Sequence, residues 1–151
     1  MLPWAALAGE REELRAVAGE VPILVAERWS AVISVLPAVR ALAFAGEVEL
    51  LRRWTESVGH AADRDRGGRG PTSHLAAEGL LALHESRLDE AADKLTRAAA
   101  TERALGYLFD AATLDLDVAA ALEAAGDSAR AAIRRAEAEA FLASIGCVNP
   151  L

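Results

Sequence analysis

The sequence predicts an all-α fold built from paired antiparallel helices. Apolar residues make up 53% of the 151 residues, yet aromatic residues make up only 5%, and many of the apolar residues are alanine. Alanine is the best helix former, and its small side chain lets helices approach closely. In addition, matching residue types recur every forty residues without a gap, which is the mark of a repeated structural unit. Together these observations favour helix-on-helix packing over a sheet.

The forty-residue register is clearest where helices should end. Gly46, Ser86 and Gly126 are spaced by forty, and Leu105-Gly106 recurs as Ile145-Gly146. Glycine tolerates the left-handed conformation that ends a helix, and serine can cap the next helix. We therefore expect connections at these positions, with Ser86 opening an approximate capping box. Four alanines lie seven apart in pairs, so that each pair shares a helical face where a partner helix can approach: Ala91, Ala98, Ala131 and Ala138.

The helices are expected in sequence order. They cover residues 3–18, 22–45, 47–58, 73–85, 88–104, 108–125 and 128–145, with Pro37 kinking or breaking the second. Residues 59–72 contain clustered glycines and a proline without apolar periodicity, which indicates a flexible loop. The chain is thus expected to form one domain, residues 1–151, made of units at about 22–58, 73–105 and 107–146.

Residues 75–98 resemble a tetratricopeptide repeat. Small residues stand midway along the first helix and early and late in the second, at Gly79, Ala91 and Ala98. The next unit offers three more in the same register: Ala119, Ala131 and Ala138. Asp115 and Arg135 depart from this pattern, because leucines stand there one unit earlier, and the period exceeds the usual ~34 residues. The longer helices and the Leu/Ile-Gly ending resemble a divergent type of repeat in the C-terminal parts of large bacterial signalling proteins, such as LuxR-type ATP-binding regulators and nucleotide-cyclase regulators.

The resemblance implies an α-α superhelix of about seven helices with a concave groove. The first helices of the pairs would line this groove with Leu36, Arg40, Phe44, Ser73, Leu80, His84, Thr113, Leu116 and Asp117. Such a groove accepts a protein or peptide, for example an amphipathic helix, and a second copy of the chain could fill it to give a homodimer. The alternative is that these side chains simply pack against neighbouring helices.

The implied function is a protein–protein interaction or scaffolding module in a bacterial signalling or transcription-regulatory protein. The alternative is a helical domain that senses a small effector, with Arg40, His84 and Asp117 as polar contacts in an apolar pocket. We also expect the chain to be part of a longer regulator, because a repeat unit needs neighbours to bury its apolar face.

Charge and cysteine content restrict the partners and the compartment. The formal net charge of −7 disfavours nucleic acid, since phosphate contacts need clustered Lys and Arg. No apolar run approaches the ~20 residues that span a bilayer, so no membrane association is expected. The single cysteine, Cys147, fits a reducing cytoplasm.

No catalytic, metal or cofactor site is predicted, and the chain is expected not to be an enzyme. The histidines His60, His74 and His84 are too few and too dispersed for zinc. Three acidic residues are interpreted as solvated or capping groups, because no base or nucleophile accompanies them: Asp110, Asp115 and Asp117. The glycines near residue 68 lack the Lys-Ser/Thr of a phosphate loop.

Overall fold

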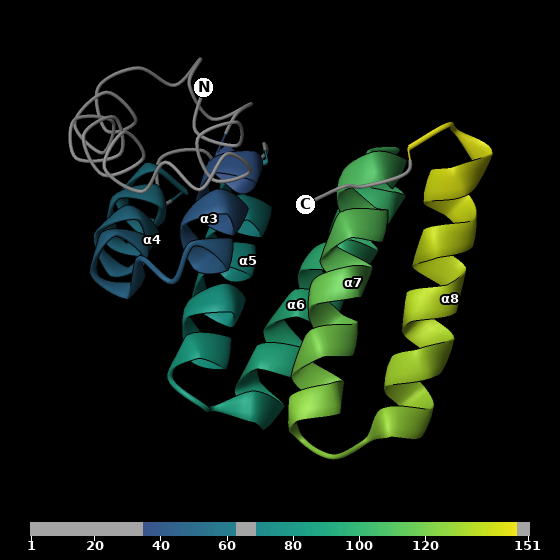
Figure 1. The fold of residues 1–151 in the computed structure, drawn as a ribbon. Coiled ribbons are helices and arrows are strands. Elements are labelled where there is room, and N and C mark those ends of the chain that lie inside the picture. The colour runs from purple at the N-terminus through teal and green to yellow at the C-terminus, as the bar shows by residue number, and fades with distance from the viewer. Residues whose placement is uncertain (1–34, 63–68, 148–151) are drawn as a thin grey trace. The chain divides into compact units, whose positions relative to one another are not determined.

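The computed structural model describes residues 35–62 and 69–147, and these residues form six α-helices and no strand (Figure 1). The helices are α3 Val35–Phe44, α4 Val48–Ala62, α5 Gly70–His84, α6 Leu88–Ala104, α7 Leu108–Ala124 and α8 Ser128–Ser144. The predicted all-α class is confirmed for this part of the chain. The first predicted helix and most of the second lie outside the described residues.

The connections fall at the residues that the register predicts. Gly46, Gly106, Gly126 and Gly146 have φ between 70° and 87°, and Ser86 has φ of 60°. Each such residue donates its backbone N–H three residues back, while the next residue donates five residues back. For example, Gly106 N–H bonds to Arg103 O at 3.1 Å and Tyr107 N–H bonds to Glu102 O at 2.9 Å. This is the Schellman pattern, which satisfies the last carbonyls of each helix.

The residue after Gly46, Ser86, Gly106 or Gly126 opens the next helix. Its carbonyl accepts the first helical hydrogen bond, as Tyr107 O does from Ala111 N–H at 3.0 Å. Helices α6, α7 and α8 each have 17 residues. With the short connections, the left-handed residues Ser86, Gly106, Gly126 and Gly146 therefore follow at intervals of twenty. The forty-residue period of the sequence is two such steps.

One capping prediction is wrong. Ser86 does not cap α6, because it occupies the left-handed position itself, and Arg87 is the N-cap residue without a side-chain cap hydrogen bond. Among the N-caps of α6, α7 and α8, only Asp127 accepts such a bond, from Arg130 N–H at 3.2 Å.

The chain divides into two compact units, and the boundary falls within α5 between Ala77 and Glu78. In the first unit α3 packs against α4, and the core includes Trp54 and Leu51, which expose 2% and 0% of their surface. The predicted loop 59–72 is helical at both ends, since α4 continues to Ala62 and α5 begins at Gly70. Residues 63–68 lie outside the described part.

In the second unit α6 packs against α7, and α7 packs against α8. The small residues of the register are buried here: Ala91, Ala98, Ala119, Ala131 and Ala138. Gly79 shows why size matters, because a Cβ atom at this position would lie 2.8 Å from Leu95 Cγ and 3.2 Å from the Leu95 backbone N. Close approach of α5 and α6 therefore requires a glycine at this point.

Candidate protein-binding surface

A buried carboxylate connects the three helices α6, α7 and α8 of the second unit. Asp115 on α7 exposes 7% of its side chain. Its Oδ1 accepts a hydrogen bond from Arg134 Nη1 on α8 at 3.0 Å, and its Oδ2 accepts one from Arg103 Nη2 on α6. A buried carboxylate is costly unless it is paired and hydrogen-bonded, and here two guanidinium groups fulfil that condition. We call these three residues the arginine–aspartate cluster.

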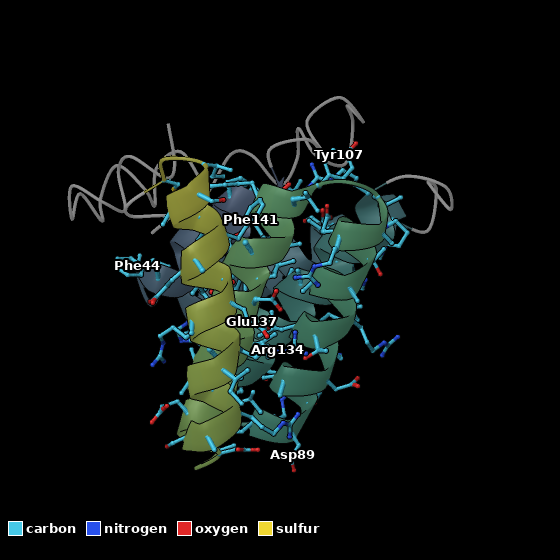
Figure 2. All side chains as sticks on the ribbon, turned by 90° about the vertical axis from the view of Figure 1, so that its right-hand side faces the viewer. Phe44, Asp89, Tyr107, Arg134, Glu137 and Phe141 are labelled. Atoms are coloured by element: carbon cyan, nitrogen blue, oxygen red, sulfur yellow. The ribbon has the colours of Figure 1, made fainter. Side chains whose placement is uncertain are left out.

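The cluster forms one end of a pocket of about 370 Å³. Apolar and charged side chains of α6, α7 and α8 line the pocket: Arg103, Leu108, Ala112, Asp115, Arg134, Glu137, Ala138 and Phe141. Figure 2 shows Arg134, Glu137 and Phe141 along α8, with Arg134 nearer the middle of the helix and Phe141 nearer its C-terminal end.

Helical spacing explains how the pocket acquires two different ends. Leu108 and Asp115 are seven residues apart on α7, and Phe141 and Arg134 are seven apart on α8. Seven residues make about two turns and roughly 10 Å. Because α7 and α8 run antiparallel, Leu108 lies at the level of Phe141 and Asp115 at the level of Arg134. The pocket is thus apolar at its outer end and charged about two turns inward.

Large apolar side chains are exposed at the end of the second unit where Leu108 begins α7. Five of them expose between 44% and 52% of their surface: Leu105, Tyr107, Leu108, Phe109 and Ile145. The first four belong to the α6–α7 connection and the start of α7, and Ile145 follows the last residue of α8 at the same end of the unit. We call these five residues the apolar end. Their exposed surface is of the order of 400 Å², within the range of the largest apolar patch of a typical monomer, which is often functional.

The opposite end of this unit is polar, although its connections have the same backbone. At the α5–α6 connection, Glu85, Arg87 and Asp89 occupy the positions that Leu105, Tyr107 and Phe109 occupy at the α6–α7 connection. Arg87 forms ion pairs with Glu85, at 2.6 Å, and with Glu90. In Figure 2, Asp89 and Tyr107 lie at opposite ends of the unit. The connection itself therefore does not require apolar side chains.

Hydrogen bonds within ion pairs shift the pKa values of three charged groups at or near the polar end. Hydrogen bonds from Lys94 and then Arg87 lower the pKa of Glu90. Burial lowers the pKa of Lys94, but hydrogen bonds to Glu90 and Glu78 outweigh it and raise that pKa. Hydrogen bonds to Glu85 and Glu90 raise the pKa of Arg87. The polar end thus neutralises its own charges within its ion pairs.

The nine predicted groove residues do not form one exposed surface within either unit. Those of the first unit are Leu36, Arg40, Phe44 and Ser73, and those of the second are Leu80, His84, Thr113, Leu116 and Asp117. Five of the nine expose 9% or less of their surface: Leu36, Arg40, Ser73, Leu80 and Thr113. Phe44 and His84 are exposed, whereas Leu116 and Asp117 are half-buried. The Thr113 hydroxyl is used locally, donating to Asp110 O at 2.9 Å.

The interpretation of Asp115 as a solvated or capping acid is wrong, because this residue is buried between two arginines. The sequence held a signal for it. Asp115 stands at a position of the repeat where Leu75 stands one unit earlier. The pattern therefore indicated a charged side chain at a core position. Its partners could not be identified from spacing, since Arg103 and Arg134 are 12 and 19 residues away on other helices.

Within residues 35–62 and 69–147, no group of three or more His, Cys, Asp or Glu side chains is arranged to hold a metal ion. No helix in that part of the chain is long and apolar enough to cross a bilayer.

Comparisons with known proteins give no match for this chain, whether with protein families, with curated proteins or with solved structures.

Proposed function

We propose that the chain is a protein-interaction module that binds a partner segment at the apolar end of its second unit. One observation carries the proposal. Leu105, Tyr107, Leu108 and Phe109 are exposed on a connection whose backbone geometry is shared with polar connections of the same unit. Burying such side chains against another molecule is favourable, and the polar connections form the same turn without them, so their exposure supports binding of a partner here.

The proposal includes a tetratricopeptide-like superhelix as the architecture. The regular twenty-residue spacing of left-handed residues supports it, because it yields antiparallel pairs of equal length. The buried small residues Gly79, Ala91 and Ala98 also support it, since they stand where such repeats need close helix contact. Proteins of this architecture use their surfaces to hold other polypeptides. By the same resemblance, we propose a role in a bacterial signalling or transcription-regulatory protein of the cytoplasm.

A second candidate function is sensing of a small effector. The pocket of about 370 Å³ beside the apolar end lies within the range of small-molecule sites, and it combines apolar walls with a few charged groups. An effector there would contact α6, α7 and α8 together and so stabilise their packing. Thermal unfolding with and without a metabolite library tests this candidate, because an effector that binds the folded state raises the Tm.

The interaction proposal is tested by peptide display. A random library of peptides of about 16 residues, long enough for roughly four helical turns, is selected on the whole chain. The selected peptides are then measured against a variant carrying Leu108→Ser and Phe109→Asp, the residue types found at the equivalent positions 128 and 89. We expect peptides that bind the natural chain and lose at least about tenfold in affinity on this variant, since two apolar contacts are removed.

Phe44→Asp is the matched control, because Phe44 is an exposed phenylalanine of the first unit and belongs to the predicted groove. It should leave peptide binding unchanged. Peptides that lose affinity on Phe44→Asp, while binding the Leu108→Ser, Phe109→Asp variant normally, would move the site to the groove predicted from the sequence. Far-UV circular dichroism of each variant verifies that it is folded.

A further inference from the structure

We infer that the partner segment is an amphipathic helix that places one Asp or Glu carboxylate in the pocket, about two turns from the apolar residue that it sets on the apolar end. This inference rests on the proposed function, since it names the partner chemistry of the same surface.

The arginine–aspartate cluster offers hydrogen-bond donors to an incoming anion. Asp115 exposes only 7% of its side chain, and each of its oxygens already accepts from an arginine. Arg103 and Arg134 expose 49% and 34% of their side chains, and each has Asp115 as its only ion-pair partner in the described part of the chain. A guanidinium group has five N–H donors, so most donors of both arginines remain for a ligand. The buried acid holds two cations in place, and together the three groups carry one net positive charge beside the pocket.

The geometry of the pocket sets the spacing within the partner. Leu108 and Phe141 mark the apolar end of the pocket, and Asp115 and Arg134 mark its charged end, seven residues away along each helix. A partner helix lying along α7 and α8 presents side chains on one face at the same spacing of about two turns. An apolar anchor and an acid six to eight residues apart would then reach both ends together. Between these ends Ala112 and Ala138 leave the depth that an inserted side chain needs.

Glu137 affects how strongly the pocket binds a carboxylate. It lines the same pocket and is exposed, and it forms no ion pair with Arg103 or Arg134. Its charge opposes that of an incoming carboxylate, although exposure to solvent screens it. Replacing Glu137 by Gln should therefore tighten binding of an acidic partner.

The shape of the pocket favours a single helix as its occupant. The pocket runs along the antiparallel helices α7 and α8, with Leu108 and Phe141 at one end and Asp115 and Arg134 at the other. An amphipathic helix laid along such a groove reaches both ends with anchors at helical spacing.

The test uses the peptide-display selection described above and compares the sequences of the selected peptides. We expect an acid six to eight residues from a Leu, Ile or Phe to be enriched. Changing this acid to its amide in the synthetic peptide should weaken binding to the natural chain by about tenfold, because hydrogen bonds to charged groups are lost. This peptide-side change does not depend on how any protein variant folds.

Protein variants then locate the carboxylate. Arg134→Gln should weaken the acidic peptide by about tenfold and leave its amide version unchanged, whereas Glu137→Gln should tighten the acidic peptide a few-fold. Arg97→Gln is the matched control, because Arg97 lies on α6 outside the pocket and pairs only with Asp93. It should alter neither peptide.

The outcomes separate this inference from the proposed function. Peptides that need Leu108 and Phe109 but bind equally well as acid and amide would overturn the inference and keep the proposed site. Failure to select any peptide that distinguishes the Leu108→Ser, Phe109→Asp variant would overturn the site itself. Sedimentation that gives a dimer mass for the natural chain and a monomer mass for this variant would assign the surface to a second copy, which also overturns the inference.

Discussion

The two ends of the second unit share a backbone but differ in their side chains. Gly106 and Gly126 have φ of 87° and 84°, and the residues that follow them donate equivalent hydrogen bonds of 2.9 Å. Yet Tyr107 follows Gly106, whereas Asp127 follows Gly126 and caps α8. The left-handed residue and its backbone hydrogen bonds are thus enough to form the connection. The residues around it can therefore differ, and they are exposed apolar side chains at one end and a helix cap with ion pairs at the other.

The largest expected effect concerns the arginine–aspartate cluster below the apolar end. Changing Arg103 and Arg134 together to Ala leaves Asp115 buried without its partners, which should lower the free energy of unfolding by about 3 kcal/mol. Urea denaturation followed by circular dichroism measures the change.

A third substitution provides the control. Adding Asp115→Leu to the double variant removes the unpaired charge and should restore most of the lost stability, because an apolar side chain can replace a buried ion pair. A double variant as stable as the natural chain would show that water already hydrates Asp115.

The left-handed positions should respond alike at both ends. Gly106→Ala and Gly126→Ala should each lower the free energy of unfolding by about 1 kcal/mol, since nothing lies within 4 Å of an added Cβ and the positive φ is the only penalty. Ser86→Gly should raise it by a similar amount, because Ser86 already adopts φ of 60°. Urea denaturation is again the measurement, and unequal costs at Gly106 and Gly126 would break the equivalence of the two connections.

Helix capping is expected to change the stability of the two ends by a smaller amount. Tyr107→Asp should stabilise the chain by up to about 1 kcal/mol, because Asp can accept a backbone N–H of α7 as Asp127 does in α8. Asp127→Ala should cost a similar amount. A loss of thermal stability on Tyr107→Asp would mean that the tyrosine side chain has a structural role.

The smallest effect concerns pH at the polar end. Hydrogen bonds from Lys94 and Arg87 lower the pKa of Glu90 below its ordinary 4.5. Its stabilisation is therefore present above about pH 4.5 and is lost as the pH falls through the lower folded-state pKa. Glu90→Gln should slightly lower the Tm at neutral pH and flatten its decline below pH 4.5. If the Tm of Glu90→Gln declines below pH 4.5 as it does in the natural chain, the ion pairs contribute nothing measurable to stability.

The sequence predicted the helical class and the positions of the connections because both depend on local chemistry. Glycine at positive φ and alanine at helix crossings are visible in a single chain, and Gly46, Gly106 and Gly126 lie where the register places them. The proposed binding surface was not predicted, since it depends on which side chains stay exposed after packing. Leu80 looked available but is 3% exposed, whereas Phe109 was not singled out and is 44% exposed.

The role of Asp115 could not be predicted from the sequence either. Its position in the register was known, but its role depends on two arginines from other helices, and only the packing of α6, α7 and α8 brings them together. The departure from the repeat pattern at this position indicated a special environment but did not identify the partners of Asp115.

The most direct test of the central claim transfers the polar connection onto the apolar one. Leu105→Glu, Tyr107→Arg and Phe109→Asp together give the α6–α7 connection the side chains of the α5–α6 connection. Chemical denaturation should give a free energy of unfolding within about 1 kcal/mol of the natural chain, because surface substitutions away from the core are nearly neutral. A loss of about 3 kcal/mol or more would show that these side chains hold the fold together and are not kept for a partner.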